Sequence, residues 1–276
     1  MLTKLDYHTI LSGTIFCMHR HILILSTATL YFTIAAYTLY LFDAGLIATS
    51  VVLFGIPAFL FAHYSAAPFP VLISVATFAA GVAILLEGIA HIYGLWYVPG
   101  VEIFRLFDLI PLEMVFAVIL KILFLSLLYE FLFDDGEYSV TNARTRFTSF
   151  GMFALATLLL FAAHYFIFKS FIFPNAYYWV TVLFVLASLS MVFLHKTLSL
   201  RLLNKLTLFA VLAAVPLFIG EVLAVLNGHK LYESIYQPVS LPFIEGIVLP
   251  FGEFLLIFSL PFFVAAVYEL YIDDRM

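Results

Sequence analysis

The sequence predicts an all-α, polytopic membrane protein with about eight transmembrane helices in two similar four-helix halves. Its 276 residues are 65% hydrophobic and 11% charged, and the mean hydropathy is +1.14, whereas an ordinary soluble domain is about 25% charged. The apolar runs are continuous, which predicts helices, because the strands of a membrane barrel alternate between apolar and polar residues. The chain is therefore expected to lie in the lipid bilayer.

Eight apolar windows are long enough to cross a membrane, since ~30 Å of hydrocarbon requires about 20 residues of helix. The predicted spans are residues 22–42, 46–64, 71–93, 109–133, 149–173, 177–195, 203–226 and 247–271. The first window follows a polar stretch that contains Lys4 and Arg20 and lacks a small-residue cleavage site after an apolar core, so it is expected to be a span and not a removable signal peptide.

The basic residues of the loops predict the orientation. With the N-terminus in the cytoplasm, the inner side collects Lys4, Arg20, Arg144, Arg146, Lys196, Arg201, Lys205 and Arg275. The outer side then carries Arg105, Lys169 and Lys230. Because positive loops tend to stay in the cytoplasm, the sequence predicts a protein of the cell (plasma) membrane with both termini in the cytoplasm.

Charge and cysteine content exclude several partners and sites. The net charge of -5 is spread without a long block of like charge, so nucleic acid is not an expected partner. Cys17 is the only cysteine, which excludes a disulfide framework and a cysteine metal cluster.

The longest inner connection, residues 134–146, divides the chain into two halves of four spans, residues 1–140 and 141–276. Because four is an even number, both halves would have the same orientation, as in a parallel repeat. When Glu113 is aligned with Gly252, the two copies stay in step for sixteen residues. The matching stretches end in Tyr129-Glu130 and Tyr268-Glu269.

Four glutamates fall at one predicted depth, in the outer third of the bilayer. Glu87 and Glu221 lie near the outer ends of the third and seventh spans, and Glu113 and Glu253 lie in the first turn of the fourth and eighth. Ionisable groups inside a membrane are costly and commonly functional. The alternative is a structural role, as a protonated glutamate bonded to a neighbouring helix or as an interfacial residue.

His91 follows Glu87 by one helical turn, so both side chains lie on one helix face and a hydrogen bond between them is expected. Two ligands without a clear third make a metal site a poor interpretation. We therefore predict neither a metal nor a cofactor, and expect His91 to orient an acid group or to bind substrate.

Three motifs carry a resemblance to a known family. Gly94-Leu95-Trp96-Tyr97, Ile110 to Glu113 and Leu127 to Glu130 resemble one half of the integral-membrane lycopene cyclases, which occur as two small subunits in some bacteria and are fused in archaea and fungi. Gly228-His229, Leu249 to Glu253 and Val267 to Glu269 resemble that half again. The similarity covers roughly residues 71–133 and 203–271.

The family motif has a proline, any residue and then two adjacent acids, and this chain keeps one acid in each half. Met114 stands at the second acid position of the first copy, and Gly252 stands at the first acid position of the second copy. Trp96 has no tryptophan counterpart near Lys230-Leu231-Tyr232.

The resemblance implies a carotenoid biosynthesis enzyme that cyclises the linear ends of lycopene to ionone rings without a redox cofactor. A carboxylic acid donates a proton to the terminal double bond, and a second group removes a proton after ring closure. Glu113 and Glu253 are the expected pair, and Glu113 is the better base because a helix N-terminus favours the anion. Glu87 and Glu221 complete the expected catalytic set.

Aromatic side chains near the same depth are expected to stabilise a carbocation in the absence of water. We predict that Trp96 and Tyr97 line the substrate pocket together with His91. The expected partners are the lipid bilayer and a hydrophobic polyene such as lycopene.

Two other function classes remain open from the sequence. A transporter or channel would use the intramembrane carboxylates to relay protons or to bind a cation. A noncatalytic carotenoid- or lipid-binding protein would bind pigment without converting it. No glycine-rich dinucleotide fingerprint is present, and the spans lack paired aspartates for a magnesium diphosphate site.

Overall fold

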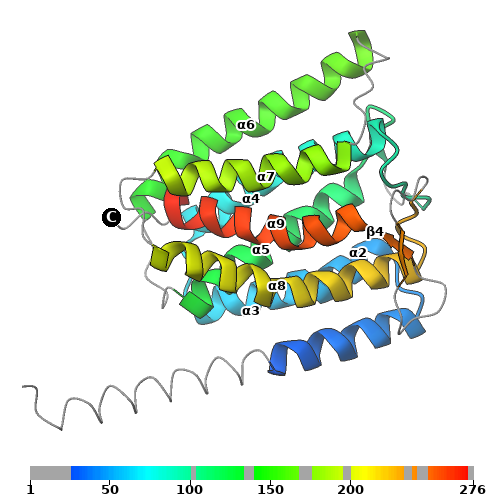
Figure 1. Ribbon diagram of the computed structural model, residues 1–276, viewed down its shortest axis with the longest axis horizontal. Coiled ribbons are helices and arrows are strands. Elements are labelled where there is room, and N and C mark those ends of the chain that lie inside the picture. Colours follow the sequence, from blue (N-terminus) through cyan, green and yellow to red (C-terminus); the bar gives the residue numbers. More distant parts are fainter. Residues whose placement is uncertain are drawn as a thin grey trace, which may run out of the picture.

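The computed structural model describes residues 26–100, 104–133, 140–167, 176–194, 200–232, 238–240 and 248–272. These residues form a bundle of long helices that run side by side, with short strands at one end (Figure 1). We call that end of the bundle the strand end. The predicted class, an all-α polytopic membrane protein, is confirmed by long apolar helices.

The helices of the described residues follow one another in the order expected from the apolar windows. They are a helix over residues 26–41, α2 (Leu46–Ser50), the π-helix η1 (Val51–Gly55), α3 (Ile56–Tyr64), α4 (Phe69–Ile92), α5 (Leu112–Phe133), α6 (Val140–Ile167), α7 (Ala176–Leu194), α8 (Leu200–Leu226), α9 (Phe251–Val267) and the π-helix η2 (Tyr268–Ile272). Two antiparallel ribbons complete the fold, β1 (Arg105–Leu106) with β2 (Ile110–Pro111) and β3 (Pro238–Ser240) with β4 (Val248–Pro250).

Six stretches of the described residues are long and apolar enough to cross a bilayer, and each overlaps a predicted window. They are Leu46–Tyr64, Phe69–Ile92, Leu112–Phe133, Arg146–Ala163, Leu202–Leu226 and Phe251–Ile272. The helix over residues 26–41 and α7 lie on the two remaining windows, so the total of eight spans stays a prediction.

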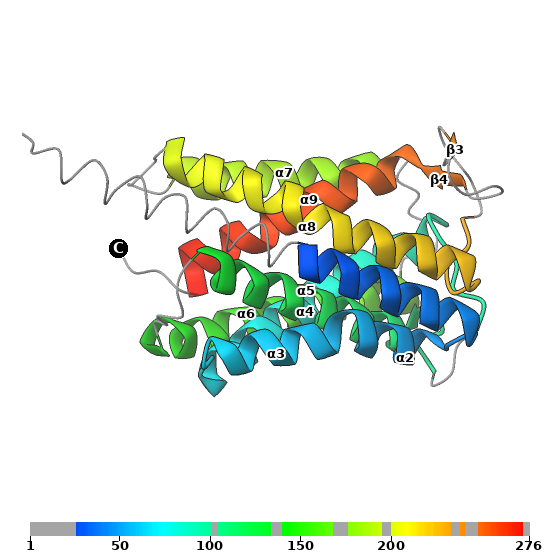
Figure 2. The same cartoon turned by 90° about the horizontal axis from the view of Figure 1, so that it is seen from below.

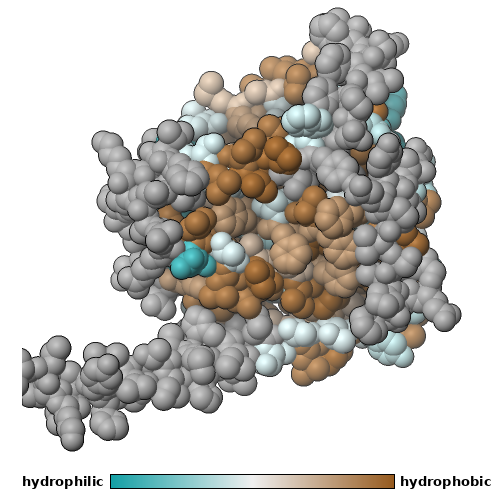
Figure 3. Space-filling model, in the orientation of Figure 1, coloured by the Kyte–Doolittle hydropathy of each residue, from teal (hydrophilic) through white to brown (hydrophobic). Residues whose placement is uncertain are grey.

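The surface of the bundle is apolar, as a lipid-covered surface requires. The face in Figure 3 is mostly hydrophobic between its two ends. Large side chains such as Ile34, Phe59 and Leu159 are exposed. On a soluble monomer, apolar patches of this extent would be unusual.

Three predicted boundaries are wrong. Helix was predicted from residues 109 and 247, but β2 and β4 occupy these places, and α5 and α9 begin only after Pro111 and Pro250. A proline keeps the residue before it extended, so Ile110 and Leu249 continue a strand. The inner connection is also shorter than predicted, because α6 already begins at Val140.

Helices α4 and α6 approach each other closely at two glycines of α4. Gly81 and Gly88 are two turns apart on one face of α4. A Cβ atom on Gly81 would lie 2.5 Å from Cδ1 of Phe153, and one on Gly88 would overlap the ring of Phe161. Small residues at a helix contact permit this close packing inside a membrane, where the hydrophobic effect does not drive helices together.

Helices α5 and α9 are the most buried spans, and they are tied together at the end opposite the strands (Figures 1 and 2). The Tyr129 hydroxyl donates to Glu269 Oε2 at 2.6 Å, and the Tyr268 hydroxyl donates to Glu130 Oε2 at 2.9 Å. Lys205 of α8 also binds Glu269, at 3.0 Å. The sequence contains the matching pairs Tyr129-Glu130 and Tyr268-Glu269. In the structure, the tyrosine of each pair binds the glutamate of the other.

This exchange predicts unequal effects of two identical substitutions. Tyr268→Phe is expected to lower the free energy of unfolding by about 1.5–3 kcal/mol, because it removes a hydrogen bond to the fully buried carboxylate of Glu130. Tyr129→Phe should cost less, since Glu269 keeps its ion pair with Lys205. The midpoint of unfolding in mixed detergent measures both effects, and equal losses would contradict the assignment.

Candidate active site

Two matched turns at the strand end position the site. α4 and α8 are each followed, two residues after their last residue, by a glycine with positive φ, Gly94 at 60° and Gly228 at 66°. The amides that follow close the turns, Leu95 N to Ala90 O at 2.9 Å and His229 N to Ala224 O at 2.8 Å. Glycine suits this helix-ending geometry because it has no Cβ atom.

The two chain segments that leave these turns pair with each other. Tyr97 N donates to Leu231 O at 2.6 Å, and Leu231 N donates to Tyr97 O at 2.8 Å. Trp96 and Lys230 are the residues just before the two bridged ones. This isolated antiparallel bridge therefore holds their side chains near the ends of α4 and α8. Both of these side chains are buried, with 4% of their surface exposed.

Lys230 is the centre of a buried ionic cluster. Its Nζ atom lies 2.6 Å from Glu221 Oε1 and 3.1 Å from Glu253 Oε1. The same ammonium lies 4.1 Å from the centre of the Trp96 ring and 5.2 Å from that of Tyr232. Two carboxylates and two aromatic faces therefore surround one positive charge.

Glu87 adds a third carboxylate to this cluster through Trp96. The indole Nε1 of Trp96 donates to Glu87 Oε2 at 3.1 Å, and 2% of Glu87 is exposed. His91 Nδ1 lies 2.9 Å from the main-chain oxygen of Glu87 and 3.7 Å from its Oε2. We call Glu87, Glu221, Glu253, Lys230 and Trp96 the carboxylate cluster.

The loop members of this site have altered acidities. Burial lowers the pKa of the Lys230 ammonium, and the neighbouring Glu221 carboxylate offsets part of that effect. Burial, followed by the charge of Glu221, raises the pKa of the Tyr232 hydroxyl well above its ordinary value. Tyr232 thus remains a hydrogen-bond donor, and its hydroxyl donates to Glu221 Oε1 at 2.7 Å.

The cluster can store protons. Lys230 binds Glu221 and Glu253, Trp96 binds Glu87, and the charge of Lys121 on α5 also acts on all three carboxyl groups. Uncompensated charge inside a protein is costly, and the charges of Lys230 and Lys121 balance the three carboxyl groups when one of them carries a proton. Such groups are suited to donating and accepting protons away from water.

The remaining predicted site residues occupy different places. Glu113 lies in the first turn of α5, as predicted, and is 1% exposed, but in the described part of the chain it does not contact Lys230. The Tyr97 ring is 41% exposed and lies 5.1 Å from the Arg105 guanidinium. Tyr97 therefore contributes its main chain to the site, and its ring lies outside the carboxylate cluster.

Sequence reasoning missed Lys230 and Tyr232. Lys230 was counted among the basic residues of the outer side, and it is buried between two glutamates. The spacing of the two copies could have indicated Lys230, since Glu87 and Glu221 are as far apart in the chain as Trp96 and Lys230. Lys230 thus occupies the place of a second tryptophan, and it binds Glu221 as Trp96 binds Glu87.

Among the described residues, no three histidine, cysteine, aspartate or glutamate side chains gather in a group that could hold a metal ion. Comparison of the chain with family models, with curated proteins and with solved structures finds no match.

Proposed function

We propose that this protein is a membrane enzyme that cyclises the linear ends of a polyene such as lycopene by acid-base chemistry, without a redox cofactor. The observation that carries the proposal is the carboxylate cluster, in which three buried carboxyl groups lie around the Lys230 ammonium and the Trp96 ring. The reaction needs a proton donor, a place that tolerates positive charge, and a proton acceptor, all shielded from water.

Glu253 is the proposed proton donor. Its Oε1 binds Lys230, while its buried Oε2 has no hydrogen-bond partner within the described residues. That oxygen is available to protonate the terminal double bond of a substrate. Glu113, in the first turn of α5, is the proposed group that stabilises the cation.

The faces of Trp96 and Tyr232 support the cation part of the proposal. Both lie close to a positive charge, that of Lys230. Aromatic faces attract cations most strongly where water is excluded. Because Lys230 already lies over one face of each ring, a tertiary carbocation gains this stabilisation at the opposite faces.

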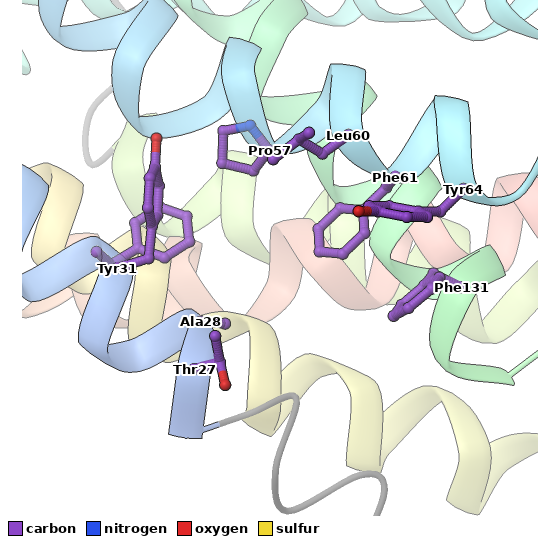
Figure 4. A pocket seen from close by; sticks show the side chains of 9 residues that line it. Thr27, Ala28, Tyr31, Pro57, Leu60, Phe61, Tyr64 and Phe131 are labelled. Carbon is purple, nitrogen blue, oxygen red and sulfur yellow. The ribbon is translucent and has the colours of Figure 1, made fainter.

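An apolar groove away from the carboxylate cluster could hold part of a hydrocarbon chain. It has a volume of about 340 Å³ and lies between the helix over residues 26–41, α3 and α5 (Figure 4). Tyr31, Phe61, Tyr64 and Phe131 are among its lining side chains. Tyr64 and Phe131 lie at the end of the bundle opposite the strands, so this groove does not reach the carboxylate cluster.

The proposed membrane arrangement has eight spans in two four-helix halves, with both termini in the cytoplasm of a cell whose plasma membrane holds the protein. The matched contacts support the two halves. Trp96-Glu87 and Lys230-Glu221 are equivalent pairs, and Tyr129-Glu269 and Tyr268-Glu130 exchange partners between the halves. The loop charges support the orientation.

The test is expression in cells that accumulate lycopene, followed by chromatography and mass spectrometry of the pigments. The wild-type protein is expected to yield a product of unchanged mass with altered retention and spectrum. Glu253→Gln should reduce conversion by about 100-fold or more, because proton transfer by a positioned group contributes on that order. Glu269→Gln, the same substitution at the opposite end of the bundle, is the control and should retain conversion.

Other outcomes point to other functions. A product heavier by one water indicates a hydratase. Unchanged lycopene with well-folded protein rejects the cyclase and favours the two alternatives. A transporter, which the bridging of Glu221 and Glu253 by Lys230 would suit, loses ion flux in Glu253→Gln without any change of pigment. A noncatalytic binding protein copurifies with unconverted pigment.

A further inference from the structure

His91 has a defined tautomer. Only 5% of its side chain is exposed, and Nδ1 lies 2.9 Å from the main-chain oxygen of Glu87. A carbonyl oxygen only accepts hydrogen bonds, so the hydrogen of the neutral ring is on Nδ1. The second ring nitrogen, Nε2, therefore carries a lone pair.

This lone pair is buried and unused. Within the described part of the chain, Nε2 of His91 has no hydrogen-bond partner. Buried polar atoms are nearly always paired in native proteins, so an unpaired atom indicates where a substrate or a water molecule binds. Oε2 of Glu253 is a second such atom. One basic nitrogen and one acid oxygen are therefore unpaired among the described residues. Contacts through Glu87, Trp96 and Lys230 connect the two side chains.

We infer that His91 Nε2 is the proton acceptor of the cyclisation, an inference that rests on the proposed function. Glu253 adds a proton to the terminal double bond, and the resulting cation closes the ring by taking the electrons of a second double bond. The C–H bond next to the ring cation then breaks, and its electron pair forms the ring double bond. The proton moves to Nε2, so the mass and the redox state of the substrate are unchanged.

Glu87 and Trp96 are the positioning residues of this base. Glu87 Oε2 lies 3.7 Å from His91 Nδ1, where its charge stabilises the imidazolium that forms. The Trp96 indole donates to the same oxygen and holds it in place. A carboxylate plays this part for histidine bases in many hydrolases. The proton returns from His91 to Glu253 before the next turnover.

The matched variant for this test is His91→Asn. The asparagine amide takes the place of Nδ1–H and keeps the bond to the Glu87 oxygen, but it has no base at the position of Nε2. Polyene consumption should continue, while the share of the wild-type ring product falls by about tenfold or more. In its place we expect rings with a displaced double bond and rings that have captured water. Glu253→Gln, in contrast, stops consumption.

The outcomes separate this inference from the proposed function. Wild-type products at the wild-type rate from His91→Asn overturn the role of His91 and leave the cyclase intact. A wild-type protein that converts no polyene overturns both.

A measurement independent of activity examines the ring itself. Nitrogen-15 NMR of histidine-labelled protein in detergent should show a neutral ring protonated at Nδ1, and this signal should be lost in His91→Asn. An imidazolium, or a ring protonated at Nε2, at this position overturns the inference whatever the activity.

Discussion

Lys230→Met is expected to lower the free energy of unfolding by about 3–5 kcal/mol, the usual cost of removing one partner from a buried ion pair. Lys230 is bonded to Glu221 and Glu253, and all three side chains are about 95% buried. Without this ammonium, Glu221 and Glu253 stay in the interior with only the charge of Lys121 acting on them. Thermal unfolding in detergent, or unfolding by a denaturing detergent, measures the loss.

Two comparisons make the Lys230 prediction specific. Lys205→Met removes an ion pair of which more than a fifth is exposed on each side, so it should cost much less. The triple variant Lys230→Met, Glu221→Gln, Glu253→Gln removes the charges together and should recover a large part of the lost stability. If Lys230→Met unfolds like the wild type, the buried ion pairs do not exist in the protein.

Gly88→Ala is expected to destabilise the fold by about 1–3 kcal/mol, the usual cost of overpacking a well-packed contact. The added methyl group overlaps the ring of Phe161, which is 3% exposed and has little room to move. α6 must then move away from α4, and the contact along both helices weakens. The unfolding midpoint in detergent measures this change as well.

Gly151→Ala is the matched control, because Gly151 lies on α6 and the nearest atom to its added Cβ, Thr77 Cγ2, is 4.0 Å away. This variant should be neutral or more stable by up to about 1 kcal/mol, since alanine favours helix over glycine. Combining Gly88→Ala with Phe161→Leu should restore part of the loss. Equal stability of the Gly88 and Gly151 variants would show that α4 and α6 do not pack as described.

The glutamates of the site show how far sequence reasoning reached. Glu113 and Glu253 were expected in the first turn of their helices, and both lie there. The hydrogen bond expected between the His91 and Glu87 side chains is not formed: His91 Nδ1 binds the main-chain oxygen of Glu87 and lies 3.7 Å from its carboxylate. The common depth of Glu87, Glu221 and Glu253 also agrees with their place in one cluster.

The proline motifs illustrate a local error. Pro111 and Pro250 were expected to lie within or at the head of helices, but each ends a short strand. Hydropathy alone locates an apolar window in the chain, but it does not define the residue at which the helix begins. The preference of the residue before proline for an extended backbone was available in the sequence and outweighs the apolar character of Ile110 and Leu249.

By itself the sequence determined the class of this protein, the windows of its long apolar helices and the place of its buried acids near the helix ends. Those properties depend on local composition, because each helix satisfies its own backbone hydrogen bonds and each apolar run partitions into lipid independently. Only the tertiary structure decided that Lys230 joins Glu221 to Glu253, that Trp96 holds Glu87, and that the ring of Tyr97 lies outside the cluster. These contacts join segments that are far apart in the chain, and they depend on how the turns after α4 and α8 pair through Tyr97 and Leu231.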